Sequence, residues 1–160
     1  MQRRNFVGLL AALTAASAAM VRRSSAGSAD SDTILDPGKP HGLVFHVGLN
    51  DPGLMATALR DAGQVTDFLA EQGIKPQIEI VATGPGLHML RDDTSPVKDA
   101  IKEFHAKFPD VVLSACNNAK KHMEANEGRK IVIVPEARIV PAGVVRMMVL
   151  HEQHWTYVWA

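Results

Sequence analysis

The sequence predicts one α/β domain with a mainly parallel β-sheet that is covered by helices on both faces. Short apolar runs typical of strands alternate along the chain with segments whose apolar residues recur at helical spacing. The 160 residues are enough for one domain with a proper core and few for two. Hydrophobic content of 46% and charged content of 21% are close to globular averages, which argues against disorder of the whole chain.

The first half of the domain is predicted to contain two strand–helix units. Residues 42–48 and 78–82 are the strand-type runs. Between them, Asn50 or Asp51 can cap a helix that carries Pro52 in its first turn, and Gly73 and Pro76 end it.

A second helix is predicted to follow residues 78–82. Asp93, Thr94 or Ser95 can cap it, with Pro96 in its first turn. Its apolar stripe has the 4-3-4 spacing of a helix that buries one face, and consists of Val97, Ile101, Phe104 and Phe108.

The second half continues the alternation. A strand over 111–115 leads directly into a short helix toward Glu127, and a helical pattern over 142–153 precedes a last strand over 155–159. Two β-rich pieces, 131–134 and 137–140, are separated by Pro135, and the pattern does not decide which of them joins the sheet. The alternation predicts a flavodoxin-like, three-layer α/β/α sandwich.

The N-terminal segment has the features of an export signal. Arg3 and Arg4 precede an uncharged apolar run over 6–20, which is too short to span a bilayer comfortably. Arg3-Arg4-Asn5-Phe6-Val7 is similar to the twin-arginine export motif, and an ordinary secretory signal is the alternative. We therefore predict an export signal over 1–26, a linker over 27–40, the domain over 41–160, and a periplasmic protein without a membrane segment after signal removal.

The charge balance excludes one class of partner. The formal net charge of the chain is zero, but four of its 17 basic residues are arginines before residue 27, and no acid precedes Asp30. From Gly27 onward the balance is 13 minus 17, or −4. An acidic domain is a poor match for nucleic acid, whose binding requires neutralisation of phosphates.

Cys116 is the candidate reactive residue. It is the only cysteine, so the chain cannot form an internal disulfide, and it follows the third strand directly ahead of a helix. Ligands and chemistry collect beyond the carboxyl ends of parallel strands, and N–H groups at a helix start favour a thiolate. A small buried structural cysteine is the alternative, but the polar Asn117 and Asn118 that follow favour function.

Three further residues are predicted to lie at the same edge of the sheet. His46 ends the first strand, and Gly84 and Gly86 follow the second. The two glycines would let the backbone approach the sulfur closely. The Gly84-Pro85-Gly86 run lacks the spacing and the lysine of a phosphate loop, so no cofactor is predicted.

Five segments, taken in order, resemble the DsrE/DsrF-like family of sulfur-relay and intracellular sulfur oxidation proteins. They cover nearly the whole predicted domain, and they are His46-Val47, 81–87, 114–118, 140–144 and 155–157. The resemblance implies a flavodoxin-like fold, homo-oligomers (trimers or hexamers), and a cysteine that carries sulfane sulfur as a persulfide. That cysteine corresponds to Cys116, and Asn118 would help to orient the sulfur.

The function expected from the resemblance is that of a carrier rather than of an enzyme with turnover. Cys116 would accept sulfur from a donor protein or small thiol and pass it to an acceptor. The alternatives are a periplasmic metal- or small-ligand-binding module and an oligomeric structural protein. His151 and His154 form an incomplete ligand pair, so no metal site is assigned. Trp155, Tyr157 and Trp159 alternate in the last strand, so they point to one face. We expect this face to pack into the core, and a subunit contact is the alternative.

Overall fold

The computed structural model describes residues 35–160, of which Asp36–Ala160 form one compact unit. The predicted export signal over 1–26 and residues 27–34 of the predicted linker lie outside the described residues. In the part that is described, no helix has both the length and the apolar character needed to cross a bilayer.

The fold is a five-stranded, all-parallel sheet between two layers of helices, so the predicted fold class is confirmed. The strand order is β4-β3-β2-β1-β5. The strands are β1 (Gly42–Val47), β2 (Gln77–Ala82), β3 (Val112–Cys116), β4 (Ala137–Val140) and β5 (Thr156–Trp159). The helices are α1 (Pro52–Glu71), the 3-10 helix η1 (Gly84–Leu90), α2 (Lys98–Lys107), α3 (Asn117–Glu127) and α4 (Gly143–Glu152).

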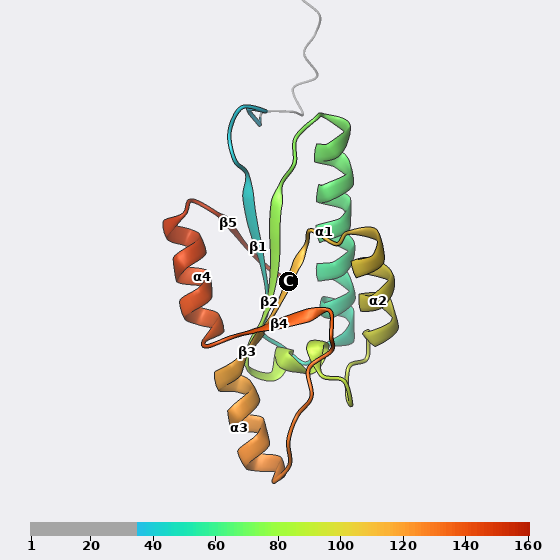
Figure 1. Cartoon of the computed structure of the whole chain (residues 1–160), viewed down its shortest axis with the longest axis vertical. Helices are drawn as coiled ribbons and strands as arrows, with labels where there is room; N and C mark the ends of the chain where they lie inside the picture. The colour runs from blue at the N-terminus through green and yellow to red at the C-terminus, as the bar shows by residue number, and fades with distance from the viewer. Residues whose placement is uncertain (1–34) are drawn as a thin grey trace, which may run out of the picture. The chain divides into compact units, whose positions relative to one another are not determined.

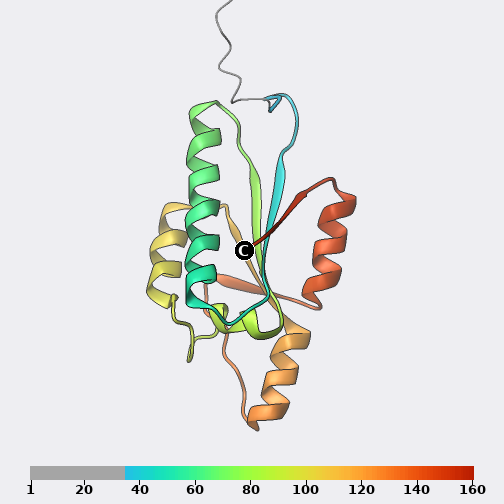
Figure 2. The ribbon, with the colours of Figure 1, turned by 180° about the vertical axis from the view of Figure 1, so that it is seen from behind.

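The two faces of the sheet are covered unequally. Helices α1 and α2 lie together on one face and α4 alone lies on the other, as the two opposite views in Figures 1 and 2 show. The α1 and α2 face holds the main core, including Phe45, Ile80 and Leu113. The α4 face holds a small cluster of Val44, Val81 and Leu150.

Helix α1 begins as the sequence predicts. The Asp51 carboxylate accepts hydrogen bonds from the backbone N–H groups of Gly53 (2.7 Å) and Leu54 (3.1 Å), and Pro52 is the first helical residue. The helix buries Met55, Ala58, Leu59, Ala62 and Leu69 against the sheet.

The prediction for the start of α2 is wrong. The helix begins at Lys98, after Pro96, and Val97 occupies the cap position without a side-chain cap. Asp93 and Thr94 are engaged elsewhere, because Asp93 binds Arg91 and the Thr94 hydroxyl bonds Nδ1 of His88 at 2.8 Å. Ser95 donates its hydroxyl to the Met89 carbonyl and accepts a hydrogen bond from the N–H of Val97, ahead of the helix. These partners are contacts of the fold that a capping pattern does not contain.

The structure resolves which β-rich piece joins the sheet. Residues 137–140 form β4, beside β3. Residues 131–134 instead form a short antiparallel bridge with the segment after η1, with hydrogen bonds from Asp92 N–H to Val132 C=O and from Val134 N–H to Leu90 C=O, both 2.9 Å.

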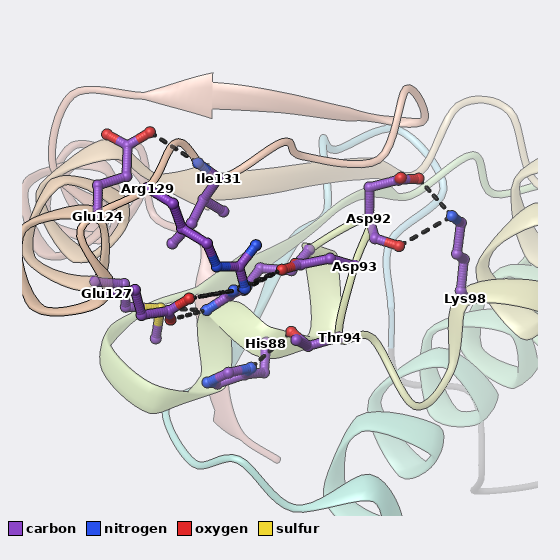
Figure 3. A network of polar contacts seen from close by, with 11 residues as sticks. His88, Asp92, Asp93, Thr94, Lys98, Glu124, Glu127, Arg129 and Ile131 are labelled. Carbon is purple, nitrogen blue, oxygen red and sulfur yellow. Dashed lines mark hydrogen bonds and ion pairs between the residues drawn. The ribbon is translucent and has the colours of Figure 1, made fainter.

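An ion cluster around the buried Arg91 fixes the segment after η1 to the end of α3. The Arg91 side chain has no exposed surface and donates hydrogen bonds to both oxygens of Asp93 and of Glu127. Figure 3 shows Asp93, Glu127 and Arg129 converging at this point. Hydrogen bonds from Arg91 hold the pKa of the Asp93 carboxyl well below its usual range. The cluster matters because α3 buries no residue of its own and extends beyond the end of the sheet (Figure 1).

Candidate functional site

Cys116 is the last residue of β3, at the carboxyl edge of the sheet. In the β3–β4 ladder it is paired with Val140. Because side chains alternate along a strand, Cys116 shares the α4 face with Ser114. The residue is 6% exposed, so its thiol is largely covered.

The sulfur of Cys116 lies at the start of α4. The backbone N–H of Gly143, the first residue of α4, donates a hydrogen bond of 3.2 Å to Sγ. The first N–H groups of a helix have no partner within the helix, and they lie at the positive end of its dipole. An N–H donor in this position stabilises the negative charge of a thiolate.

The sequence predicted a helix start beside the sulfur but assigned the wrong helix. Cys116 precedes α3, yet its side chain makes no hydrogen bond to the N–H groups of that helix. The backbone of Cys116 is still extended, with φ −70° and ψ 114°, so its side chain follows the pleat of β3 toward α4. The donor thus comes from a residue 27 positions further along the chain.

His46 lies at the same edge and is the centre of a second polar group. Its Nδ1 bonds the Tyr157 hydroxyl and its Nε2 bonds the Thr83 hydroxyl, both at 2.7 Å. The Trp159 ring packs edge-on against the imidazole, with ring centroids 4.7 Å apart. Burial lowers the pKa of His46, which favours the neutral imidazole. Each hydroxyl can donate or accept, so both ring nitrogens are satisfied in the neutral form.

Thr83 connects the His46 group to the Cys116 group. Its hydroxyl reaches His46, while its methyl group packs against the backbone of Gly143. A Cβ atom added to Gly143 would lie 2.4 Å from Cγ2 of Thr83 and 3.3 Å from Cβ of Cys116. Only glycine therefore allows the first turn of α4 to approach β2 and β3 closely enough for its N–H to reach the sulfur.

Gly84 and Gly86 perform a different role from the predicted one. A Cβ atom on Gly86 would lie 2.2 Å from the carbonyl oxygen of Val47, and Gly84 has a positive φ of 46°. The nearest atom to a Cβ on Gly84 would be the carbonyl oxygen of Gly48, at 3.8 Å. These glycines therefore let η1 approach the end of β1, not Cys116.

Asn117 and Asn118 open α3 beside the sulfur. Asn117 is half-buried and Asn118 is exposed. Among residues 35–160 neither side chain forms a hydrogen bond to Sγ. Neither asparagine therefore orients the sulfur through a hydrogen bond in this structure.

The histidines do not gather into a ligand set. His151 and His154 are both exposed at the end of α4, and His154 has a positive φ of 64°. Within the described range no group of three or more His, Cys, Asp or Glu side chains has the arrangement of a metal site.

Several functional candidates were missed by sequence reasoning. Gly143 belongs to a small-residue run, Pro141-Ala142-Gly143, and such a run ahead of a helix is a usable signal of close backbone approach. Thr83 and Tyr157 lie in two of the segments that resemble the family, 81–87 and 155–157, but they were not singled out as site residues. Glu79, Arg138 and Arg146 form a cluster on the α4 face of the sheet. They are far apart in sequence, and no motif predicts that they meet.

The comparisons with known proteins support the fold alone. No family model matches the sequence, and no curated protein is significantly similar to it. A solved structure described as a protein of unknown function, MTH1491 from Methanobacterium thermoautotrophicum, superposes with a TM-score of 0.63 at 21% identity. The match covers 75% of this chain and 99% of that chain. The chain accordingly has the α/β, flavodoxin-like architecture that the sequence predicts.

Proposed function

We propose that the protein is a sulfur carrier in which Cys116 holds a sulfane sulfur as a persulfide. The observation that carries the proposal is the 3.2 Å hydrogen bond from the first N–H of α4 to Sγ. A thiolate is the nucleophilic form of cysteine, and a donor at a helix start stabilises it. The resemblance of five ordered segments to the DsrE/DsrF-like family supports the same chemistry.

The low exposure of Cys116 would affect how fast sulfur is exchanged, and not whether the exchange is favourable. Thiol exchange requires an in-line approach to the sulfur, so access controls the rate. A persulfide adds one sulfur about 2 Å beyond Sγ.

The proposal is tested by mass spectrometry of the full chain after incubation with inorganic polysulfide. The expected result is a gain of one sulfur mass, reversed by a reducing thiol and absent in Cys116→Ser. Lys121→Ala is the control, because it changes an exposed polar residue further along α3. Absence of the adduct in the native protein, with full reaction of Cys116 after unfolding, would show an inert structural cysteine. Stoichiometric zinc or copper without an adduct would indicate a metal-binding module instead.

We further propose that the protein self-associates through α4 and β5. Val144 and Met148 are four residues apart on α4, so they form one ridge, and both are exposed. Tyr157 and Trp159 of β5 are also exposed on this face, contrary to the expectation that they pack into the core. Together these four residues are an apolar surface of the kind that monomers avoid exposing. A homo-oligomer, the state that the family resemblance implies, would cover it.

The proposed place of action is the periplasm, and this part rests on the sequence before residue 27. Its test is the cellular location of the full chain carrying a C-terminal tag. Export that stops in Arg3→Lys, Arg4→Lys would support the twin-arginine route. Unchanged export in that variant would indicate an ordinary secretory signal.

A further inference from the structure

Two arginines converge on one buried carboxylate in the layer between the sheet and α4. Glu79 of β2 is 1% exposed, and its carboxylate accepts a hydrogen bond of 2.6 Å from the Ser114 hydroxyl. Arg146 of α4 binds it through Nε and Nη2, at 2.7 to 3.1 Å. Arg138 of β4 binds it through Nη2 at 2.9 Å, and binds Ser114 through Nε at 3.0 Å.

The cluster keeps one positive charge in excess. Burial alone would raise the pKa of Glu79, but hydrogen bonds from Arg146, Ser114 and Arg138 outweigh it and hold the pKa below its ordinary value. Two guanidinium groups thus face one carboxylate. Nη1 of neither arginine has a hydrogen-bond partner among residues 35–160, and the two side chains are 47% and 27% exposed. The excess charge and the free donors therefore remain available to a ligand.

The same two arginines line a pocket of about 440 Å³ between β4 and the start of α4. The remaining walls are apolar, and no acidic residue lines it. Its side walls include Ile139, Val140, Val145 and Val149. Val145 and Val149 lie about 100° around α4 from the Val144 and Met148 ridge, so the pocket and the proposed self-association surface use different sides of the helix.

Two walls of the pocket adjoin Cys116, which is not itself a lining residue. Val140, one of its walls, is the ladder partner of Cys116, and Ala142, another wall, precedes the glycine that binds Sγ. Arg138 and Val140 lie on the same face of β4, two residues apart, which corresponds to roughly 7 Å between their Cα atoms. Two residues along β4 thus separate Arg138 from the ladder partner of Cys116.

We propose that this pocket binds a small organic anion and, resting on the proposed function, that the occupant is a carboxylate-bearing thiol persulfide that delivers sulfur to Cys116. The carboxylate pairs with Nη1 of Arg138 and Arg146, because a charge-assisted bond to guanidinium is strong and directional. The carbon chain lies against the valines, and the sulfane sulfur points toward Sγ. Glu79 is a positioning residue that holds both arginines at the rim.

The transfer step is balanced without another reactant. The Cys116 thiolate attacks the outer sulfur of R–S–SH, and a new S–S bond forms on Sγ. The old S–S bond breaks, and R–S⁻ leaves with the electron pair. The hydrogen stays on the transferred sulfur, so the products are the Cys116 persulfide and a thiolate.

The test compares two donors that differ in charge: the persulfides of 3-mercaptopropionate and of 2-mercaptoethanol. In the wild-type full chain, we expect the anionic donor to load Cys116 faster, by on the order of tenfold at equal low concentration. Arg138→Gln should lower the ratio of the anionic-donor rate to the neutral-donor rate from about tenfold toward one. Lys102→Gln is the control, since it removes an exposed charge from α2 on the opposite face.

A second measurement separates the pocket from the chemistry. Chemical-shift changes on titration with 3-(methylthio)propionate, which cannot transfer sulfur, should occur at Val145 and Val149 and disappear in Arg138→Gln. Equal loading rates with both donors in the wild type would overturn the donor assignment. So would an equal fall of both loading rates in Arg138→Gln. Absence of probe binding would overturn the anion pocket. Probe binding with neither donor loading Cys116 would instead overturn the carrier function and leave the anion pocket standing.

Discussion

The first N–H of α4, on Gly143, points at the sulfur of Cys116 from 3.2 Å away, and no side chain larger than hydrogen fits at residue 143. The hydrogen bond and the requirement for glycine at residue 143 have one cause, which is the close packing of the start of α4 against β2 and β3. The contact therefore connects the stability of this layer to the chemistry of the thiol.

Gly143→Ala is expected to destabilise the protein by about 1–3 kcal/mol, because the new methyl group would overlap Thr83 and press on Val81 and Cys116. It should also speed alkylation of Cys116, since displacement of α4 exposes the sulfur. Urea unfolding and the alkylation rate of the native protein measure the two effects.

Gly53→Ala is the matched control for this prediction. Gly53 also lies in the first turn of a helix, but an added Cβ would contact only an oxygen of the exposed Asp51 side chain, at 3.1 Å. The two variants should therefore differ clearly in stability. Equal stability of Gly143→Ala and wild type would show that α4 can shift without cost.

The sequence predicted the fold because the fold depends on local periodicity. Runs such as 42–48 and 78–82 are strands wherever their partners lie, and the stripe from Val97 to Phe108 buries one face of α2 as expected. The start of α2 was mispredicted because Asp93 and Thr94 bind Arg91 and His88 instead of the helix. That competition depends on how η1 ends, which no capping pattern describes.

The candidate site was predictable only as far as the topology determines it. The carboxyl edge of a parallel sheet brings His46 and Cys116 to one side of the molecule, and the sequence predicts that edge. The contacts on the edge involve Gly143, Thr83 and Tyr157, and they arise from tertiary packing across long sequence separations. A pattern read along the chain contains no information on such pairs.

Acid is expected to destabilise the protein partly through Asp93. Its folded pKa lies below its ordinary value of 3.8, so its ion pair with Arg91 stabilises the fold above that value. This contribution is lost as the pH falls below about 4 toward the folded pKa. Asp93→Asn should be less stable than wild type at pH 7, and the difference should narrow in acid. Urea unfolding between pH 7 and pH 2 measures both curves.

Asp99→Asn provides the comparison for the acid experiment. Asp99 is an exposed aspartate in the first turn of α2 that forms no ion pair with any side chain in the described part of the chain. The free energy of unfolding of Asp99→Asn, plotted against pH, should run parallel to that of the wild type. A constant difference between Asp93→Asn and wild type at all pH values would rule out the assigned role of the carboxylate.

His46 is expected to titrate below 6.5 in the folded protein, because burial disfavours the imidazolium. A lowered folded pKa means that the unfolded chain binds the proton more readily. The stability that depends on neutral His46 is thus complete above 6.5 and declines as the pH falls through that value. NMR titration of the imidazole in the native and urea-unfolded protein measures the two midpoints. A native midpoint at or above the unfolded one would contradict the assignment.

The exposed ridge on α4 gives the last prediction. If Val144 and Met148 are covered by a second copy, a charge placed there must be buried against an apolar partner, which is costly. Val144→Glu and Met148→Glu should shift the molar mass measured by light scattering toward that of the monomer, without changing the circular dichroism of the fold. Phe68→Glu is the matched control, because Phe68 is a similarly exposed apolar residue on α1, on the opposite face of the sheet.

A wild-type protein that is monomeric at every concentration would refute self-association. Dissociation by Phe68→Glu alone would show that the interface lies on α1 instead. The Arg138 and Arg146 pocket predicts in addition that binding of 3-(methylthio)propionate survives in Met148→Glu, because that residue lies outside the pocket walls.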